Sequence, residues 1–260
     1  MKTMLAVLAA GIAIISAAPA HADQVMMVYH YDDAETPEAQ HGRQLMMDDE
    51  LLEGLTHYVN DTLNLPSDVL VLAQQCGGTD VVDSTDGETI WLCYETIEHA
   101  ERMFANDNHP DPATAALNFT NALFFHELGH ALIRVFDLPF TGREEDVADQ
   151  LGAVLLLAPG EDGKPYPHLV QIALDTARRW GLYAAEAGDE EYDHSERHSF
   201  NLQRMYNWLC WIYGSDPEAN ASIVTSGDLP EDRAVWCDEE FQKMSAGWHL
   251  MLEPYLREPD

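Results

Sequence analysis

The chain has 260 residues, of which 46 are acidic and 13 are lysine or arginine, so its formal net charge is −33. This length allows one substantial domain or two small ones. Because so acidic a surface repels phosphate backbones and anionic membranes, the composition argues against a nucleic-acid-binding protein. Solubility in a salty medium explains the charge most simply. A calcium site in the acidic stretch 186–196 is a second interpretation, although this stretch lacks the EF-hand spacing.

The N-terminus has the pattern of a secretory signal peptide. Lys2 precedes an apolar run over residues 4–18, and Ala-His-Ala at 20–22 forms a small-x-small cleavage site. A membrane anchor is the alternative, but the apolar run is short for a membrane span. We therefore expect residues 1–22 to be a signal peptide and residues 23–260 to form one domain. The mature protein would then be secreted or periplasmic, without a stable membrane anchor.

The first part of the mature chain alternates strand-like and helical segments. Residues 24–31 are strand-like, and residues 38–65 have apolar side chains at helical intervals, which predicts one helix. The segments DVLVLAQQC (68–76) and ETIWLCYE (88–95) have the composition of strands, and an acidic turn joins them. We expect these two strands to form a hairpin that a disulfide ties together.

The four cysteines fit an oxidising compartment. Cys76 and Cys93 flank the Gly- and Asp-rich turn, whereas Cys210 and Cys237 lie near the ends of two helical segments. We expect disulfides 76–93 and 210–237, although four cysteines allow three pairings. A cysteine-ligated zinc is the alternative, but the chain has no C-x-x-C, and the sequence therefore favours disulfides.

From Thr96 onward nearly every predicted element is a helix, and Pro- and Gly-rich breaks separate the helices. The predicted helices cover 96–106, 112–137, 143–158, 167–187, 197–214 and 231–252. A small sheet that is followed by helices predicts the α+β class, with mostly α structure.

Two histidines and a glutamate, namely His126, Glu127 and His130, stand in the middle of FFHELGHALIRVF (124–136), a run that is otherwise nearly all apolar. Burying such groups without partners costs roughly 2–7 kcal/mol each. Residues four apart lie on one face of a helix, so His126 and His130 can bind a single ion, and Glu127 can reach a water on that ion. The alternative is that hydrogen bonds within the core satisfy both histidines.

A catalytic zinc site usually has three protein ligands and an open position for water. The spacing H-E-x-x-H-x-x-G-x-x-H is excluded, because Ile133 and Phe136 stand at the relevant positions. The next predicted helix, 143–158, carries Glu145 and Asp149 near its start. Glu145 can supply the third ligand, and Asp149 can accept the outer N–H of a ligating histidine.

Acidic residues at the start of a helix also have a simpler role. They stabilise the helix dipole, and this role explains Glu144 and Asp146. For Glu145 and Asp149 we favour the metal-binding roles over the dipole interaction.

The motif HELGH followed by G-R-E-E-x-x-A-D (142–149) resembles the bacterial "putative metallopeptidases", a domain-of-unknown-function family of zincin type. The E-x-x-A-D element is also similar to the third-ligand segment of gluzincins. This similarity implies that Glu145 is a metal ligand and that Asp149 is a hydrogen-bond acceptor for a ligating histidine. The resemblance extends to CGG…IWLCYE before the motif and to HSFNLQRMYNWLCWIYG and LPEDRAVWCDEEF after it, so it covers most of the mature chain. It implies a zincin-like metallopeptidase fold, in which a helical bundle carrying the H-E-x-x-H helix follows a small sheet.

The expected function is that of a zinc-dependent metallopeptidase acting on peptides or proteins. One Zn²⁺, bound by His126, His130 and Glu145, would activate a water, and Glu127 would take the proton of that water. Two alternatives stay open. One is a zinc amide hydrolase that acts on cell-wall peptides, and the other is a zinc-bound, non-catalytic interaction protein.

A later segment, RHSFNLQRMYNWLCWIYG (197–214), offers donors for the oxyanion that forms when water attacks the carbonyl. The candidates are His198, Arg204, Tyr206 and Tyr213, and the family resemblance favours the first two. Arg204 could also bind a substrate carboxylate or form a structural salt bridge. The alternative for Tyr206 is a place in the aromatic core. An extended peptide could add to strand 88–95 if this strand forms the sheet edge beside the cleft.

Overall fold

The computed structural model describes residues 25–78, 87–160, 162–188, 195 and 197–257. The expected signal peptide and most of the acidic stretch 186–196 lie outside these residues. The strands are β1 (Met27–Tyr31), β2 (Val69–Gln74) and β3 (Thr89–Cys93). The helices are α1 (Pro37–Asp48), α2 (Leu51–Thr62), α3 (Tyr94–Asn106), α4 (Pro112–Val135), α5 (Glu144–Leu156), α6 (Pro167–Ala187), α7 (Asn201–Ser215), α8 (Ser222–Thr225), α9 (Glu231–Ala234) and α10 (Cys237–Leu252), followed by the short 3₁₀ helix η2 (Glu253–Tyr255).

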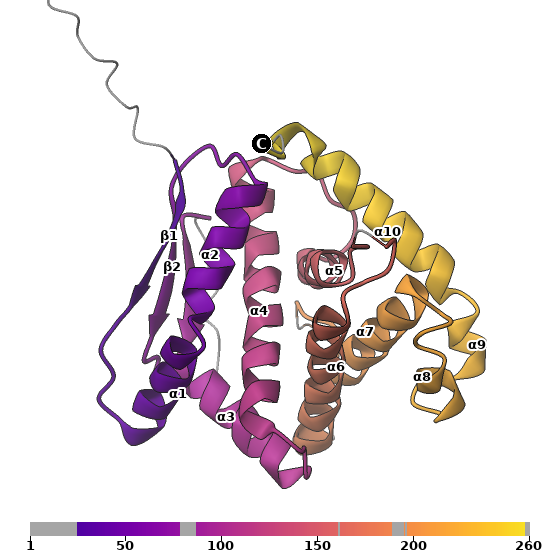
Figure 1. The fold of residues 1–260 in the computed structure, drawn as a ribbon, viewed down its shortest axis with the longest axis horizontal. Helices are drawn as coiled ribbons and strands as arrows, with labels where there is room; N and C mark the ends of the chain where they lie inside the picture. Colours follow the sequence, from indigo (N-terminus) through magenta and orange to yellow (C-terminus); the bar gives the residue numbers. More distant parts are fainter. Residues whose placement is uncertain (1–24, 79–86, 161, 189–194, 196, 258–260) are drawn as a thin grey trace, which may run out of the picture.

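Helix α4 runs through the middle of the molecule (Figure 1). The sheet and helices α1 to α3 lie on one side of it, and α5, α6, α7 and α10 lie on the other. Helix α4 packs directly against α3, α5 and α6. The described residues are mostly helical with one small sheet, which confirms the α+β, mostly α class.

The sheet is parallel throughout, in the order β1-β2-β3. The hairpin that we expected from 68–76 and 88–95 is therefore wrong. Parallel strands need a crossover of about a dozen residues or more, and the connection from 75 to 88 is long enough to supply one. The composition of the two strands and the acidic turn does not distinguish the two arrangements, because strand direction depends on the path of this connection.

Both expected disulfides are present in the structure. Cys76 follows the end of β2 and Cys93 ends β3, so their Cα atoms are 5.5 Å apart at the same edge of the sheet. Cys210 of α7 pairs with Cys237 at the start of α10, with Cα atoms 5.1 Å apart. No helix in the described part of the chain is long and apolar enough to cross a membrane.

Four predicted boundaries are wrong. Helix α7 begins at Asn201 and not at residue 197, so His198 precedes the helix. The helix expected at 38–65 is two helices, because Glu50 adopts a left-handed conformation (φ 51°) between α1 and α2. The helix expected at 231–252 is likewise broken between α9 and α10. Tyr94, which we expected in a strand, begins α3. Apolar residues continue at helical intervals through the first two breaks, so periodicity alone did not reveal them.

Local sequence explains the start of α4 and the close approach of α5. The Asp111 side chain accepts a hydrogen bond from the Thr114 N–H at 3.2 Å, and Pro112 occupies the first turn, where its missing N–H costs nothing. Further along α4, a Cβ on Gly129 would lie only 2.9 Å from the Cα of Ala148 in α5. The glycine and alanine therefore let α4 and α5 approach closely beside the two motif histidines.

Candidate metal centre

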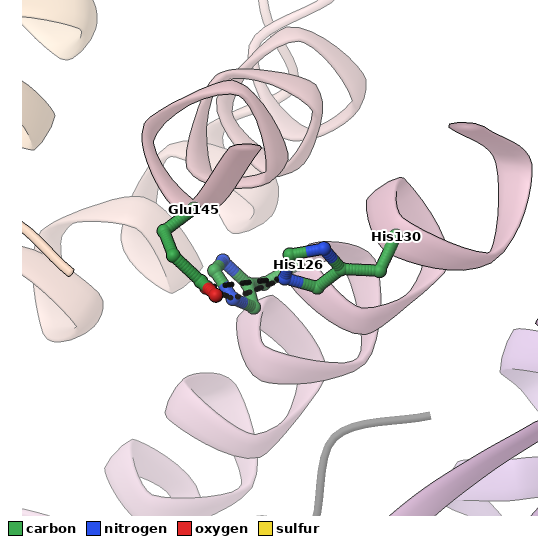
Figure 2. A group of neighbouring side chains, drawn as sticks. All are labelled: His126, His130 and Glu145. Carbon is green, nitrogen blue, oxygen red and sulfur yellow. Dashed lines mark hydrogen bonds and ion pairs between the residues drawn. The ribbon is translucent and has the colours of Figure 1, made fainter. Parts of the chain in front are cut away.

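Three buried side chains from α4 and α5 converge on one point (Figure 2). His126 and His130 lie one turn apart on α4, and Glu145 comes from the first turn of α5. The Nε2 atoms of the two histidines are 3.3 Å apart, and Glu145 Oε2 lies 3.3 Å from His126 Nε2 and 3.1 Å from His130 Nε2. One nitrogen or oxygen atom from each residue therefore faces the same small volume.

The opposite nitrogen of each histidine contacts a carboxylate. His126 Nδ1 lies 2.9 Å from Asp149 Oδ1, and His130 Nδ1 lies 2.7 Å from Glu144 Oε1. A carboxylate only accepts hydrogen bonds, so both Nδ1 atoms carry the proton. In the neutral imidazoles the two Nε2 lone pairs then face Glu145.

This set of atoms fits a metal ion. Two imidazole lone pairs and a carboxylate oxygen meet within 4.8 Å of one another, and each is an acceptor. Such a group is electrostatically unfavourable in a buried site unless a cation or added protons lie between its members. The buried His126, His130 and Glu145 group, together with its outer hydrogen bonds, therefore indicates a metal-binding site.

The same close contacts shift the pKa values of His126 and Glu145 in the metal-free protein. Burial by itself lowers the pKa of His126, but its hydrogen bonds to Asp149 and Glu145 outweigh burial and raise the pKa to about 9. Burial raises the pKa of Glu145, but hydrogen bonds from His126, His130 and His198 outweigh it and hold the pKa well below its usual range. Protons therefore neutralise the cluster when no metal is bound, and a metal must displace them.

Each of the three α5 carboxylates that contact a motif histidine also contacts an arginine. The Arg204 guanidinium donates two hydrogen bonds to Asp149, at 2.7 Å from Nε and 2.6 Å from Nη2. Arg134 Nη2 lies 3.4 Å from Glu144 Oε1, and Arg197 Nη2 lies 2.7 Å from Glu145 Oε1. These contacts balance the concentration of negative charge at the start of α5.

Arg204 is buried and faces the metal site through Asp149. Its guanidinium carbon lies 3.5 Å from the centre of the Trp180 ring of α6, so an aromatic face covers one side of the charge. Together with His126, Arg204 holds the pKa of the Asp149 carboxyl below its usual range against the opposite effect of burial. Tyr206 lies two residues further on, on a different face of α7, and packs against the hydrophobic core.

His198 lies at the entrance to the cluster. Its Nε2 is 3.0 Å from Glu145 Oε2, its ring stacks on His126 with centroids 6.3 Å apart, and its side chain is 44% exposed. Arg143 holds this segment by donating to the His198 carbonyl at 3.1 Å and to Ser199 Oγ at 2.6 Å. The hydroxyl of Ser199 donates to Asp146 at 2.5 Å, so residues 198–199 are fixed to the first turn of α5.

Glu127 occupies the position between the two histidines on α4 and is 6% exposed. Its negative charge contributes to the raised pKa of both His126 and His130, which places its carboxylate within electrostatic reach of the cluster.

Several members of this site were not predicted from the sequence. The helix dipole explained Glu144 and Asp146, whereas Glu144 also contacts His130 and Asp146 also accepts a hydrogen bond from Ser199. Arg134 and Arg197 were not among the predicted site residues. The position of Arg134 four residues after His130 was the one available signal, because residues at this spacing share a helical face.

Comparison with known proteins gives a family for most of the chain. Residues 31–252 match the family described as "Putative metallopeptidase". No curated protein and no solved structure gave a significant match. Because the matched region spans 222 of the 260 residues and includes all three members of the buried cluster, the chain belongs to the "Putative metallopeptidase" family.

Proposed function

We propose that this protein is a zinc-dependent metallopeptidase that works outside the cytoplasm. The observation that carries the proposal is the convergence of His126 Nε2, His130 Nε2 and Glu145 Oε2 within 3.3 Å of one another. Two histidines and a glutamate are a common protein ligand set of catalytic zinc, which keeps its fourth position for water or substrate. The family membership supports a peptide or protein substrate.

Glu127 is the proposed general base. When bound, a zinc ion lowers the pKa of its water to about 7 and polarises the scissile carbonyl. Glu127 follows His126 on α4, and its carboxylate is close enough to raise the pKa values of both histidines. It accepts the proton of the attacking water and returns it to the leaving amine.

His198 is the proposed donor to the substrate. Its imidazole lies beside Glu145 and His126 but is far more exposed than either of them, so a peptide carbonyl can reach it. A hydrogen bond from this imidazole would stabilise negative charge that develops on the carbonyl oxygen. The contacts of Arg143 to residues 198 and 199 keep this imidazole in place.

The location outside the cytoplasm has two supports. The two disulfides are compatible with an oxidising compartment. The sequence of residues 1–22 also has the organisation of a signal peptide.

The test combines metal analysis with a peptide digest. Purified mature protein should contain one zinc per chain and cleave members of a broad peptide library, and a chelator should stop the cleavage. Addition of zinc should then restore it. Cleavage of muropeptides but of no ordinary peptide would instead indicate a cell-wall amide hydrolase. A fully zinc-loaded protein that cleaves neither class would indicate an interaction protein, and a protein that binds no zinc would overturn the proposal.

A further inference from the structure

A carboxylate contacts the Nδ1 atom of each motif histidine, but the two carboxylates stand at different places relative to the E-x-x-A-D element. Asp149 contacts His126 and belongs to the E-x-x-A-D element. Glu144 contacts His130 and stands one residue before Glu145, outside that element. Its contact is the shorter of the two, at 2.7 Å against 2.9 Å. Glu144 is therefore placed to do for His130 what Asp149 does for His126.

Arg134 holds the Glu144 carboxylate from the other side. It lies one helical turn after His130, so both side chains meet the carboxylate from the same face of α4. Arg134 Nη2 is 3.4 Å from Glu144 Oε1, the oxygen that also contacts His130 Nδ1. The Arg134 and Glu144 side chains are 25% and 24% exposed, so solvent screens this ion pair only partly.

The segment before β3 passes so close to Arg134 that residue 87 has no room for a side chain. Gly87 precedes β3 with φ 74°, and a Cβ at this position would lie 2.9 Å from the Cβ of Arg134. A side chain at residue 87 would therefore collide with Arg134. The position of Arg134 is fixed by the packing of this segment on α4.

We propose that Glu144 is a positioning residue for the metal site and that Arg134 holds it there. Glu144 accepts the Nδ1 proton of His130 and so keeps the Nε2 lone pair directed at the ion, which increases the affinity for metal. The proposal rests on the proposed metal function of His126, His130 and Glu145. It concerns metal affinity and does not depend on peptide cleavage.

The helix dipole offers a competing account that makes a different prediction. A dipole interaction requires the negative charge of Glu144, so replacement by Gln or by Ala would have the same effect. A positioning role requires an acceptor at the place of Glu144 Oε1. Because the Gln amide oxygen can still accept the Nδ1–H, Glu144→Gln should retain much of the affinity that Glu144→Ala loses.

The experiment measures zinc affinity by competition with a chromophoric chelator, together with the visible spectrum of the cobalt(II)-loaded protein. Glu144→Ala should bind zinc roughly 10–100-fold more weakly and alter the cobalt bands, whereas Glu144→Gln should stay within about threefold of the unmodified chain. The matched control is Glu38→Ala, which removes an exposed glutamate from the first turn of α1 and should change neither readout.

Equal zinc affinities for Glu144→Ala and the unmodified chain, or equal losses for Glu144→Ala and Glu144→Gln, would overturn the proposal. If Glu144→Ala does not fold, Arg134→Met provides the second test, because it leaves Glu144 in place without its cation. This variant should bind zinc less tightly than the unmodified chain, and unchanged affinity would count against the role of Arg134. Absence of zinc binding by the unmodified chain would instead refute the proposed function itself.

Discussion

Arg204 of α7 donates a hydrogen bond to each carboxylate oxygen of Asp149 in α5, with Nε 2.7 Å from Oδ2 and Nη2 2.6 Å from Oδ1. Both side chains are buried, and Asp149 Oδ1 also contacts His126 Nδ1. The proposed metal site is thereby connected through one carboxylate to a helix that follows it by more than fifty residues in the chain. Stability and metal binding should consequently depend on the same contact.

Replacement of Arg204 by Met should destabilise the protein by about 3–5 kcal/mol, because the Asp149 carboxylate stays buried and loses both charged hydrogen bonds from the guanidinium. The measurement is the free energy of unfolding in urea for the metal-free protein. Arg102→Met is the control, since it breaks an i,i+4 pair with Glu98 in which Arg102 is 55% exposed, and it should cost about 0.5 kcal/mol or less. A similar loss in both variants would show that the bidentate contact contributes little.

Glu127→Gln should abolish peptide hydrolysis and leave zinc bound. The Gln side chain has nearly the same shape, but its amide cannot take the proton of the attacking water. The measurements are turnover of a cleaved library peptide and zinc content per chain. Turnover close to that of the unmodified enzyme would remove Glu127 from the mechanism.

Glu145→Ala should lower the affinity for zinc by about 100-fold or more. This loss exceeds the roughly 10–100-fold loss expected when a residue that hydrogen-bonds a ligand is removed. The substitution removes the oxygen that lies 3.3 Å from His126 Nε2 and 3.1 Å from His130 Nε2. The control is Asp238→Ala, an acidic residue in the first turn of α10. Equal zinc affinities in the two variants would exclude Glu145 as a ligand.

His198→Ala should lower kcat by about tenfold or more, with zinc still bound, because a donor to the developing oxyanion is lost. His57→Ala is a suitable control, since His57 is an exposed histidine of α2 whose side chain is 78% exposed. A variant with normal kcat and a full complement of zinc would leave His198 without a catalytic role.

The metal-free protein should lose stability as the pH rises from about 6.5 to about 9. The folded-state pKa of His126 is raised to about 9, above its ordinary value of 6.5, so protonated His126 stabilises the fold. This contribution is fully present below about pH 6.5 and disappears as the pH passes the folded-state pKa. Zinc affinity should increase over the same range, because zinc competes with that proton.

The measurements for this prediction are the Tm of the metal-free protein and the zinc affinity, both followed across this pH range. His126→Asn removes one titrating group, so the pH dependence of Tm should become smaller, and the remainder should come from His130, whose pKa is also raised. If the variant and the unmodified chain show the same dependence, another group is responsible for it.

The sequence by itself determined features that depend on neighbouring residues. Asp111 and Pro112 specify the start of α4, and the spacing of His126 and His130 places both on one helical face. The positions of Cys76 and Cys93 on either side of the turn also led to the correct pairing, although it is the parallel arrangement that brings the C-terminal ends of β2 and β3, and with them both cysteines, to one edge of the sheet.

Only the tertiary structure decided the direction of the strands and the partner of Glu144. A strand has the same alternating pattern in either direction, so the pattern of β2 did not show that it runs parallel to β3. A glutamate at a helix start interacts with the dipole in any protein, but Glu144 reaches His130 only because Gly129 and Ala148 let α5 approach α4. Long-range contacts of this kind depend on how helices pack, and local periodicity carries no information about that packing.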